Sequence, residues 1–102
     1  MPKYKVEILT PALNDIDKIA DYHLIMVGPV SAQKITDKIL STIEILVEYP
    51  EAGSEHPDIF LSKQGYRKII SGDYVCIYKV IEEVVYIYRV VHGAMDYPKL
   101  LR

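Results

Sequence analysis

The stretch Tyr66–Gly93, YRKIISGDYVCIYKVIEEVVYIYRVVHG, decides the fold. It is rich in Tyr, Val and Ile and has a period of two, which is typical of β-strands. Two polar pairs, Gly72-Asp73 and Glu82-Glu83, interrupt it and are short enough to form hairpin turns. The sequence therefore predicts an antiparallel meander of three strands: 66–71, 74–81 and 84–92.

Upstream of the meander, two apolar stripes have helical spacing. The first stripe runs from Ala12 to Val27 and follows Thr10-Pro11, where the Thr10 hydroxyl is the predicted N-cap. Gly28-Pro29 ends this helix and starts a second one, which ends before Pro50. The two helices form a hairpin, and we expect its apolar side chains to be largely buried on the sheet: Ile16, Ile19, Ile39, Ile43 and Leu46.

Two shorter segments complete the organisation. Residues 4–9 contain good strand formers and predict a first strand ahead of the helices. Residues 51–65 have no period, and a proline and two glycines among them predict a loop that can hold one helical turn at Asp58–Leu61. The whole chain, 1–102, is therefore predicted to be one α+β domain: an N-terminal strand, an α-helical hairpin, and a three-stranded antiparallel meander with the helices packed on one face.

The composition is that of an ordinary globular protein. Half of the 102 residues are hydrophobic and a quarter are charged, which excludes disorder and low complexity. No apolar run approaches the roughly 20 residues that a membrane helix needs, and Met1–Lys5 is not followed by the apolar segment of a signal peptide. The single cysteine cannot form an internal disulfide or a cysteine-based zinc site. We expect a cytoplasmic protein that binds no membrane, metal or cofactor.

Charge is unevenly distributed along the chain. Residues 1–60 carry five basic and ten acidic side chains, whereas residues 61–102 carry seven basic and four acidic ones, together with six of the nine tyrosines. A basic, tyrosine-rich half suits an anionic partner, such as nucleic acid or an acidic peptide. A chance imbalance on a solvated surface explains the same numbers equally well.

Strand alternation assigns Arg67, Lys79 and Arg89 to one face of the sheet, and leaves open which face the helices cover. Three cations among aliphatic side chains can hold a phosphate or carboxylate, or can simply extend their charged ends to the sheet edge. His92, at the end of the last strand, is a candidate general base or a structural hydrogen-bonding residue. Cys76 is expected to be a core thiol rather than a nucleophile.

The order and spacing of these motifs resemble the RelE/ParE superfamily of type II toxins. The meander carries Tyr66-Arg67-x-Ile69, Tyr74-x-x-x-Tyr78-x-Val80 and Val85-x-Ile87-x-Arg89-Val90-Val91-His92-Gly93, followed by Asp96. The N-terminal half carries Thr10-Pro11-Ala12, Ile16-x-x-Ile19-x-x-Tyr22 and Leu46-x-x-x-Pro50-x-x-Gly53. The resemblance spans nearly the whole chain. It implies the fold predicted above and a cognate antitoxin protein that wraps and silences the toxin.

The superfamily has two branches with different actions. RelE-like members are ribosome-dependent mRNA endonucleases that use several basic residues around one phosphate, whereas ParE-like members bind and poison DNA gyrase. Arg67 matches the first basic position of the nuclease branch, but Ile69, Val75 and Ala94 stand where the other cations are expected. The ending Val91-His92-Gly93-x-x-Asp96-Tyr97 resembles the ParE branch more closely.

The resemblance thus favours a ParE-like toxin that stabilises a plasmid or locus and acts by binding DNA gyrase, more in keeping with a binding protein than an enzyme. The alternative is a RelE-like, metal-independent endoribonuclease that acts on mRNA at the ribosome, with Arg67, Arg89 and His92 as catalytic residues. A third interpretation is an inactive toxin that retains only antitoxin binding. The antitoxin is expected to contact Arg67, Lys79 and Arg89. A homodimer and a toxin–antitoxin hetero-oligomer both remain open.

Overall fold

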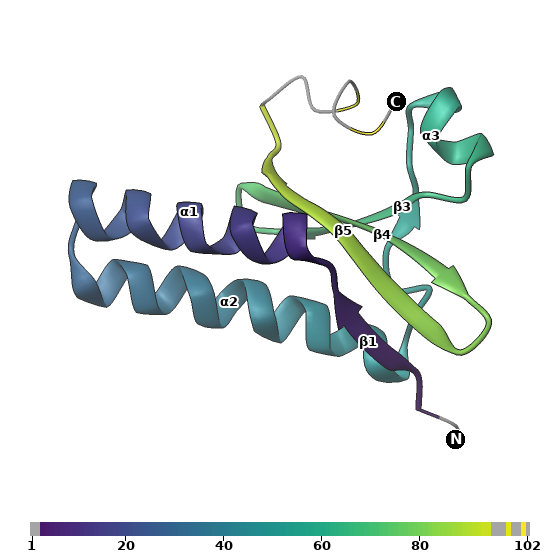
Figure 1. The fold of residues 1–102 in the computed structure, drawn as a ribbon, viewed down its shortest axis with the longest axis horizontal. Coiled ribbons are helices and arrows are strands. Elements are labelled where there is room, and N and C mark those ends of the chain that lie inside the picture. Colours follow the sequence, from purple (N-terminus) through teal and green to yellow (C-terminus); the bar gives the residue numbers. More distant parts are fainter. Residues whose placement is uncertain (1–2, 95–97, 99–100, 102) are drawn as a thin grey trace.

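The computed structural model describes residues 3–94, 98 and 101, and its elements follow the predicted order. A strand is followed by two long antiparallel helices, a connection, and three further strands (Figure 1). The helices are α1 (Thr10–Met26), α2 (Pro29–Glu48) and the short α3 (Ile59–Lys63). The strands are β1 (Lys5–Ile8), β2 (Ser54–Glu55), β3 (Arg67–Ser71), β4 (Tyr74–Ile81) and β5 (Val84–His92).

The sheet has five strands in the order β1-β5-β4-β3-β2. The predicted meander β3–β4–β5 is confirmed as antiparallel, and β2, which the sequence analysis did not predict, pairs antiparallel with β3. The N-terminal strand β1 pairs in parallel with β5. Parallel pairing requires a long crossover connection, and the helical hairpin supplies one across the face of the sheet. The α+β class is therefore confirmed, with a mixed sheet.

The helical hairpin packs on one face of the sheet, as predicted. Ile16, Ile39, Ile43 and Leu46 are buried there, and Ile19 is half-buried against the same core. On the sheet side, this core includes Tyr74, Cys76 and Tyr78 of β4 and Val85, Ile87 and Val90 of β5. Alternation left open which face of the sheet the helices cover. It is the face that carries the even-numbered residues of β4.

A bulge in β5 changes which residues share a face. Tyr78 pairs with Ile87, but the preceding Ile77 pairs with Arg89, so Tyr88 is an extra residue opposite β4. Such a bulge shifts the alternation of one strand relative to its neighbour. Because directly opposed residues share a face, Ile87 lies with Tyr78 on the helix-covered side. This pairing is set by the turn, which places Ile81 opposite Val84, so the odd-numbered residues at the start of β5 face even-numbered residues of β4.

The start of α1 differs from the predicted cap. Thr10 is already helical, Leu9 occupies the N-cap position, and no side chain caps the helix. Instead, the Leu9 N–H donates to the carbonyl of Ile87 at 3.0 Å, so the sheet itself orients the first turn. At the other end of α1 the predicted break is confirmed, because Gly28 has a φ of 139°, which glycine adopts readily.

The described residues cover the opposite face of the sheet only in part. Leu61, from the predicted helical turn that forms α3, is buried against this face, and Leu101 packs at its margin. The sheet residues beneath them are Tyr66, Val75, Ile77 and Val91, with Tyr88 partly buried. The protein therefore has a large core under the helical hairpin and a small one under α3.

Candidate functional site

Arg67 ties the turn at residues 50–53 to the sheet. Its Nη2 donates to the Gly53 carbonyl oxygen at 2.7 Å, and its Nε lies 3.5 Å from the Tyr78 hydroxyl. That hydroxyl in turn donates to the Pro50 carbonyl at 2.8 Å and accepts the Gly53 N–H at 3.2 Å. A side chain at position 53 would collide with the Lys68 carbonyl, so glycine is required. The guanidinium of Arg67 is thus used by the chain itself.

Arg89 forms an ion pair with Asp15 of α1. Its Nε and Nη2 donate to the two carboxylate oxygens at 2.7 and 2.9 Å, and the Val90 N–H donates to the same carboxylate at 2.9 Å. This hydrogen bonding raises the pKa of Arg89. The edge strand β1 pairs with β5 only as far as Ile87. Asp15 therefore accepts the Val90 N–H, which β1 does not reach. The sequence carried no local signal for this contact, because 74 positions separate the partners.

Lys79 engages two tyrosine rings on the other face of the sheet. Its Nζ lies 4.1 Å from the ring centre of Tyr66 and 5.4 Å from that of Tyr88, which is the geometry of a cation–π contact. Arg67, by contrast, pairs with Tyr78 on the helix-covered side, and Arg89 turns to α1 at the bulge. The prediction that the three cations share one face is therefore wrong. Their contact with an antitoxin stays a prediction.

His92 is exposed at the end of β5 and lines a pocket of about 520 Å³ between α1 and the β3–β4 turn. Its ring packs edge-on against Tyr74, with ring centres 5.6 Å apart, and its Nδ1 accepts the Ala94 N–H at 3.1 Å. This "His92 pocket" is lined by Lys18, Ile19, Tyr22, His23, Ile35, Asp73, Tyr74 and His92. Neither Arg67 nor Arg89 lines it, so the three candidate catalytic residues are not brought together.

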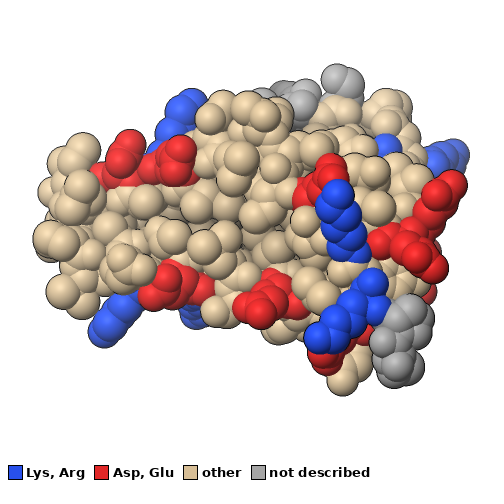
Figure 2. Space-filling model, turned by 60° about the horizontal axis from the view of Figure 1, so that its bottom comes forward, with Lys and Arg blue, Asp and Glu red and all other residues tan. Residues whose placement is uncertain are grey.

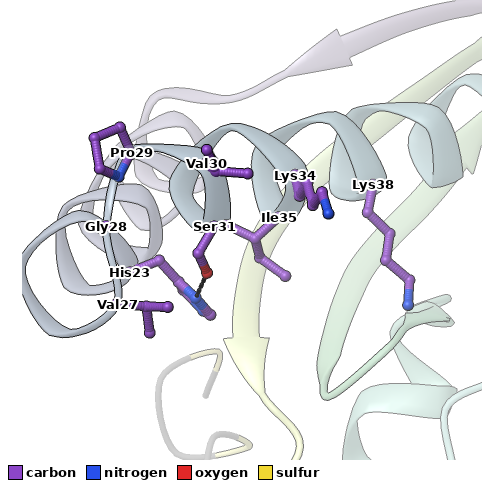
Figure 3. Close-up of a pocket in the computed structure, with 9 residues that line it drawn as sticks. All are labelled: His23, Val27, Gly28, Pro29, Val30, Ser31, Lys34, Ile35 and Lys38. Carbon is purple, nitrogen blue, oxygen red and sulfur yellow. Dashed lines mark hydrogen bonds between the residues drawn. The ribbon is translucent and has the colours of Figure 1, made fainter.

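His23 links the His92 pocket to a second one. Its Nδ1 lies 3.1 Å from the Ser31 hydroxyl and its Nε2 lies 3.3 Å from the hydroxyl of Tyr74, whose pKa is raised by burial. The second pocket, also about 520 Å³, lies at the end of the hairpin (Figure 3). This "Lys34 pocket" is lined by His23, Val27, Gly28, Pro29, Val30, Ser31, Lys34, Ile35 and Lys38.

The hairpin tip, residues 22–32, is apolar and exposed. It contains no Asp, Glu, Lys or Arg, while Ile25 is 79% exposed and Val27 71%. Figure 2 shows this end of the molecule, at the left, without charged side chains on its outermost surface, whereas both signs of charge crowd the other end. Helical spacing groups Val27 with the buried stripe, but the hairpin extends beyond the sheet (Figure 1), and nothing in the described residues covers it there.

Two other reactive side chains are buried. Cys76 lies in the main core, as predicted, and burial raises the pKa of its thiol to about 12. His56 accepts the Asp58 N–H at Nδ1, 3.0 Å away, and burial, together with the charge of Lys68, lowers its pKa. Within the described part of the chain, no three His, Cys, Asp or Glu side chains are placed to hold a metal ion. Its helices are too short or too polar to cross a membrane.

Comparison with known proteins identifies a matching family and solved structures with the same fold. The sequence matches, over residues 6–97, the family described as ParE toxin of type II toxin–antitoxin system, parDE. The matching ending His92-Gly93-x-x-Asp96-Tyr97 lies partly outside the described residues, since Asp96 and Tyr97 are not among them. No match was found among curated protein sequences.

Two solved structures have the same fold. A chain of the chromosomal ParDE toxin–antitoxin system from P. aeruginosa superposes with a TM-score of 0.76 at 19% identity, and the match covers 90% of this chain and 98% of that chain. A chain of the toxin–antitoxin complex RelBE2 from Mycobacterium tuberculosis superposes with a TM-score of 0.65 at 21% identity, covering 88% and 98%. At these identities the likeness shows the fold alone.

Proposed function

Since this chain belongs to the ParE toxin family of type II toxin–antitoxin systems, we propose that it acts in the cytoplasm by binding and poisoning DNA gyrase. A cognate antitoxin neutralises it, and stabilisation of a plasmid or locus is its role. The family match supports a gyrase poison over a nuclease.

The exposed hairpin tip carries the proposal that the toxin acts through protein contact. Contiguous exposed apolar surface commonly marks an interaction site, and the centres of protein interfaces are depleted of charge. The tip meets both conditions, because its large side chains are exposed and residues 22–32 carry no acidic or basic side chain. We expect the tip to contact gyrase.

The arrangement of cations gives little support to the nuclease alternative. Cleavage of RNA without a metal needs several donors around one phosphate, and loss of one such group typically costs about 10²–10³ in rate. Arg67 donates to backbone carbonyls and Arg89 to Asp15, so both would have to abandon their partners to hold a phosphate. Among the three candidate catalytic residues, His92 lines the His92 pocket, and neither Arg67 nor Arg89 does.

Two features support an antitoxin partner. Both solved structures named above are described as toxin–antitoxin systems, and β1 is an edge strand, whose outer side is open to pairing by another chain. Lys79 is the most suitable of the expected antitoxin-binding cations to mutate, because it forms no ion pair with a described residue. Arg89→Glu would also break the ion pair with Asp15. Lys79→Glu should weaken capture of the antitoxin encoded beside the toxin, and the loss should be largest at low salt, where the charges are least screened.

Inhibition of DNA supercoiling by purified gyrase tests the proposed target. The wild-type chain should inhibit supercoiling, and the Ile25→Ser/Val27→Ser variant should need at least about tenfold more protein for the same inhibition. Ile59→Ser is the matched control, since Ile59 on α3 is 70% exposed but distant from the tip. Codon-positioned mRNA cleavage in a purified translation system, lost in His92→Ala, with gyrase unaffected, would instead establish the nuclease alternative.

A further inference from the structure

The His92 pocket combines side chains of three chemical kinds in one place. Lys18 and His92 carry nitrogen donors, Tyr22 and His92 carry aromatic rings, and Asp73 carries a carboxylate. From this combination we propose that the pocket binds a nucleotide, with the phosphate on Lys18 and His92 and the base against Tyr22. The proposal does not depend on the gyrase proposal, because its ligand is different, although the two surfaces adjoin and share Tyr22 and His23.

The cations of this region have no acidic partner among the described residues. Elsewhere Arg89 is paired with Asp15, Lys5 with Glu7 and Lys3 with Glu48. Lys18 in the His92 pocket, and Lys34 and Lys38 in the Lys34 pocket, form no ion pair with any residue that the structure describes. In a chain with a formal net charge of −2, these unpaired ammonium groups make a local site for an anion.

His92 is held in place as a hydrogen-bond donor. Because its Nδ1 accepts the Ala94 N–H, the proton of the neutral ring is on Nε2, for which the described residues offer no acceptor. The ring is also fixed by its edge-on contact with Tyr74, and the Gly93 N–H donates to the Asp73 carbonyl at 2.9 Å. The end of β5 and the β3–β4 turn are therefore tied together, which brings His92 and Asp73 to the same pocket.

The remaining lining suits the uncharged parts of a nucleotide. Tyr22 is 58% exposed and forms a T-shaped contact with the His23 ring at 5.7 Å between ring centres, so it is accessible to a ligand. Bases stack on accessible aromatic rings. Asp73 can accept hydrogen bonds from ribose hydroxyls or a base amine, as carboxylates do in dinucleotide sites. A volume of about 520 Å³ lies within the range of small-molecule pockets.

The His92 pocket continues into the Lys34 pocket, since His23 and Ile35 line both. Lys34 and Lys38 lie one helical turn apart on α2, and Figure 3 shows both side chains extending from α2. The Lys38 ammonium also lies close to Gly72, beside Asp73. A nucleotide within a single strand would therefore find further cations for its neighbouring phosphate, whereas a free nucleotide would occupy the His92 pocket alone.

Binding of two probes at low salt tests the proposal: adenosine 5′-monophosphate by calorimetry, and a fluorescein-labelled DNA single strand of six nucleotides by anisotropy. Lys18→Gln should weaken binding of each probe about tenfold relative to the wild-type protein, because it removes one charge-assisted contact. Lys63→Gln is the matched control, an exposed lysine on α3 that lines neither pocket. Tyr22→Ala should also weaken binding about tenfold. Tyr49→Ala, which removes a tyrosine of similar exposure (60%) at the far end of α2, should leave binding unchanged.

The two probes distinguish the two sources of the nucleotide. If the strand binds more tightly than the mononucleotide and Lys34→Gln weakens only the strand, the ligand is single-stranded nucleic acid, and the salt dependence should fall by about one unit of slope for each lysine removed. If the two probes bind equally and Lys34→Gln has no effect, the ligand is a free nucleotide. The proposal is overturned if neither probe binds, or if Lys63→Gln weakens binding as much as Lys18→Gln.

Discussion

The two ends of the α1–α2 hairpin have similar apolar sequences but opposite surroundings. At the base, Ile39 is fully buried against the sheet, whereas at the tip Val27, which helical spacing places on the buried stripe, is 71% exposed. The sheet lies under the base of the hairpin and does not extend to the tip (Figure 1). Helical periodicity therefore identifies an apolar face but does not say what covers it. The base stabilises the fold, and the tip remains available for a partner.

The largest expected difference between base and tip is in thiol reactivity. Burial beneath the base raises the pKa of Cys76 to about 12 from an ordinary value near 9, so at pH 8 its thiolate fraction is about a thousandfold lower. A cysteine introduced at the tip by Val27→Cys should react with a disulfide reagent at the normal rate, and faster as pH rises toward 9. Cys76 should stay unreactive across this range until the protein is unfolded. Comparable rates at the two positions would contradict the burial of Cys76.

The next difference is in stability. Ile39→Ala should lower the free energy of unfolding by about 2–5 kcal/mol, because it removes buried methyl groups and leaves a cavity. Ile25→Ala, the same change at the tip, should cost less than about 0.5 kcal/mol. Urea denaturation followed by circular dichroism measures both. Equal losses would show that the tip is covered in the free protein.

Much of the fold was predictable from the sequence, because the signals for its helices, strands and turns are local. The period of two in the meander, the turns at Gly72 and Glu82, and the break at Gly28 each act within a few residues, and all of these elements are confirmed. The bulge at Tyr88 was not predictable. In a strand where Tyr and Val suit either face, an extra residue leaves no mark on the pattern.

The candidate site was less predictable, because it depends on the pairing of strands and on contacts between distant segments. The single cationic face failed because the two-residue turn pairs Ser71 with Tyr74, which places Arg67 opposite Tyr78 and not on the face of Lys79. The partners of Arg67 and Arg89 come from distant parts of the chain. Lys18 was not singled out, and Tyr22 was named only as part of the family motif, since both are ordinary surface residues of an amphipathic helix. Only the topology, which brings α1 against the end of β5 and the β3–β4 turn, places them beside His92.

A charge at the base of α1 should matter more than a similar charge near the tip. Asp15→Ala should cost about 2–3 kcal/mol, because it removes a two-pronged ion pair with Arg89 and leaves the Val90 N–H without its acceptor. Asp21→Ala, at an exposed position farther along α1, should cost less than about 0.5 kcal/mol. Adding Arg89→Ala to Asp15→Ala should cost less than the sum of the two single changes. Strict additivity would mean that the ion pair contributes nothing.

The smallest expected effect is on the stability of the tip itself. Ile25→Ser/Val27→Ser should leave the free energy of unfolding within about 0.5 kcal/mol of the wild type, since both side chains are already in solvent when the protein is folded. The variant should also self-associate less in analytical ultracentrifugation, because exposed apolar surface favours association. A loss of toxicity in cells expressing it then reports a lost contact rather than a lost fold. If unfolding becomes easier by more than about 1 kcal/mol, and more so at high protein concentration, a second copy of the chain covers the tip, and the contrast between the two ends of the hairpin belongs only to the monomer.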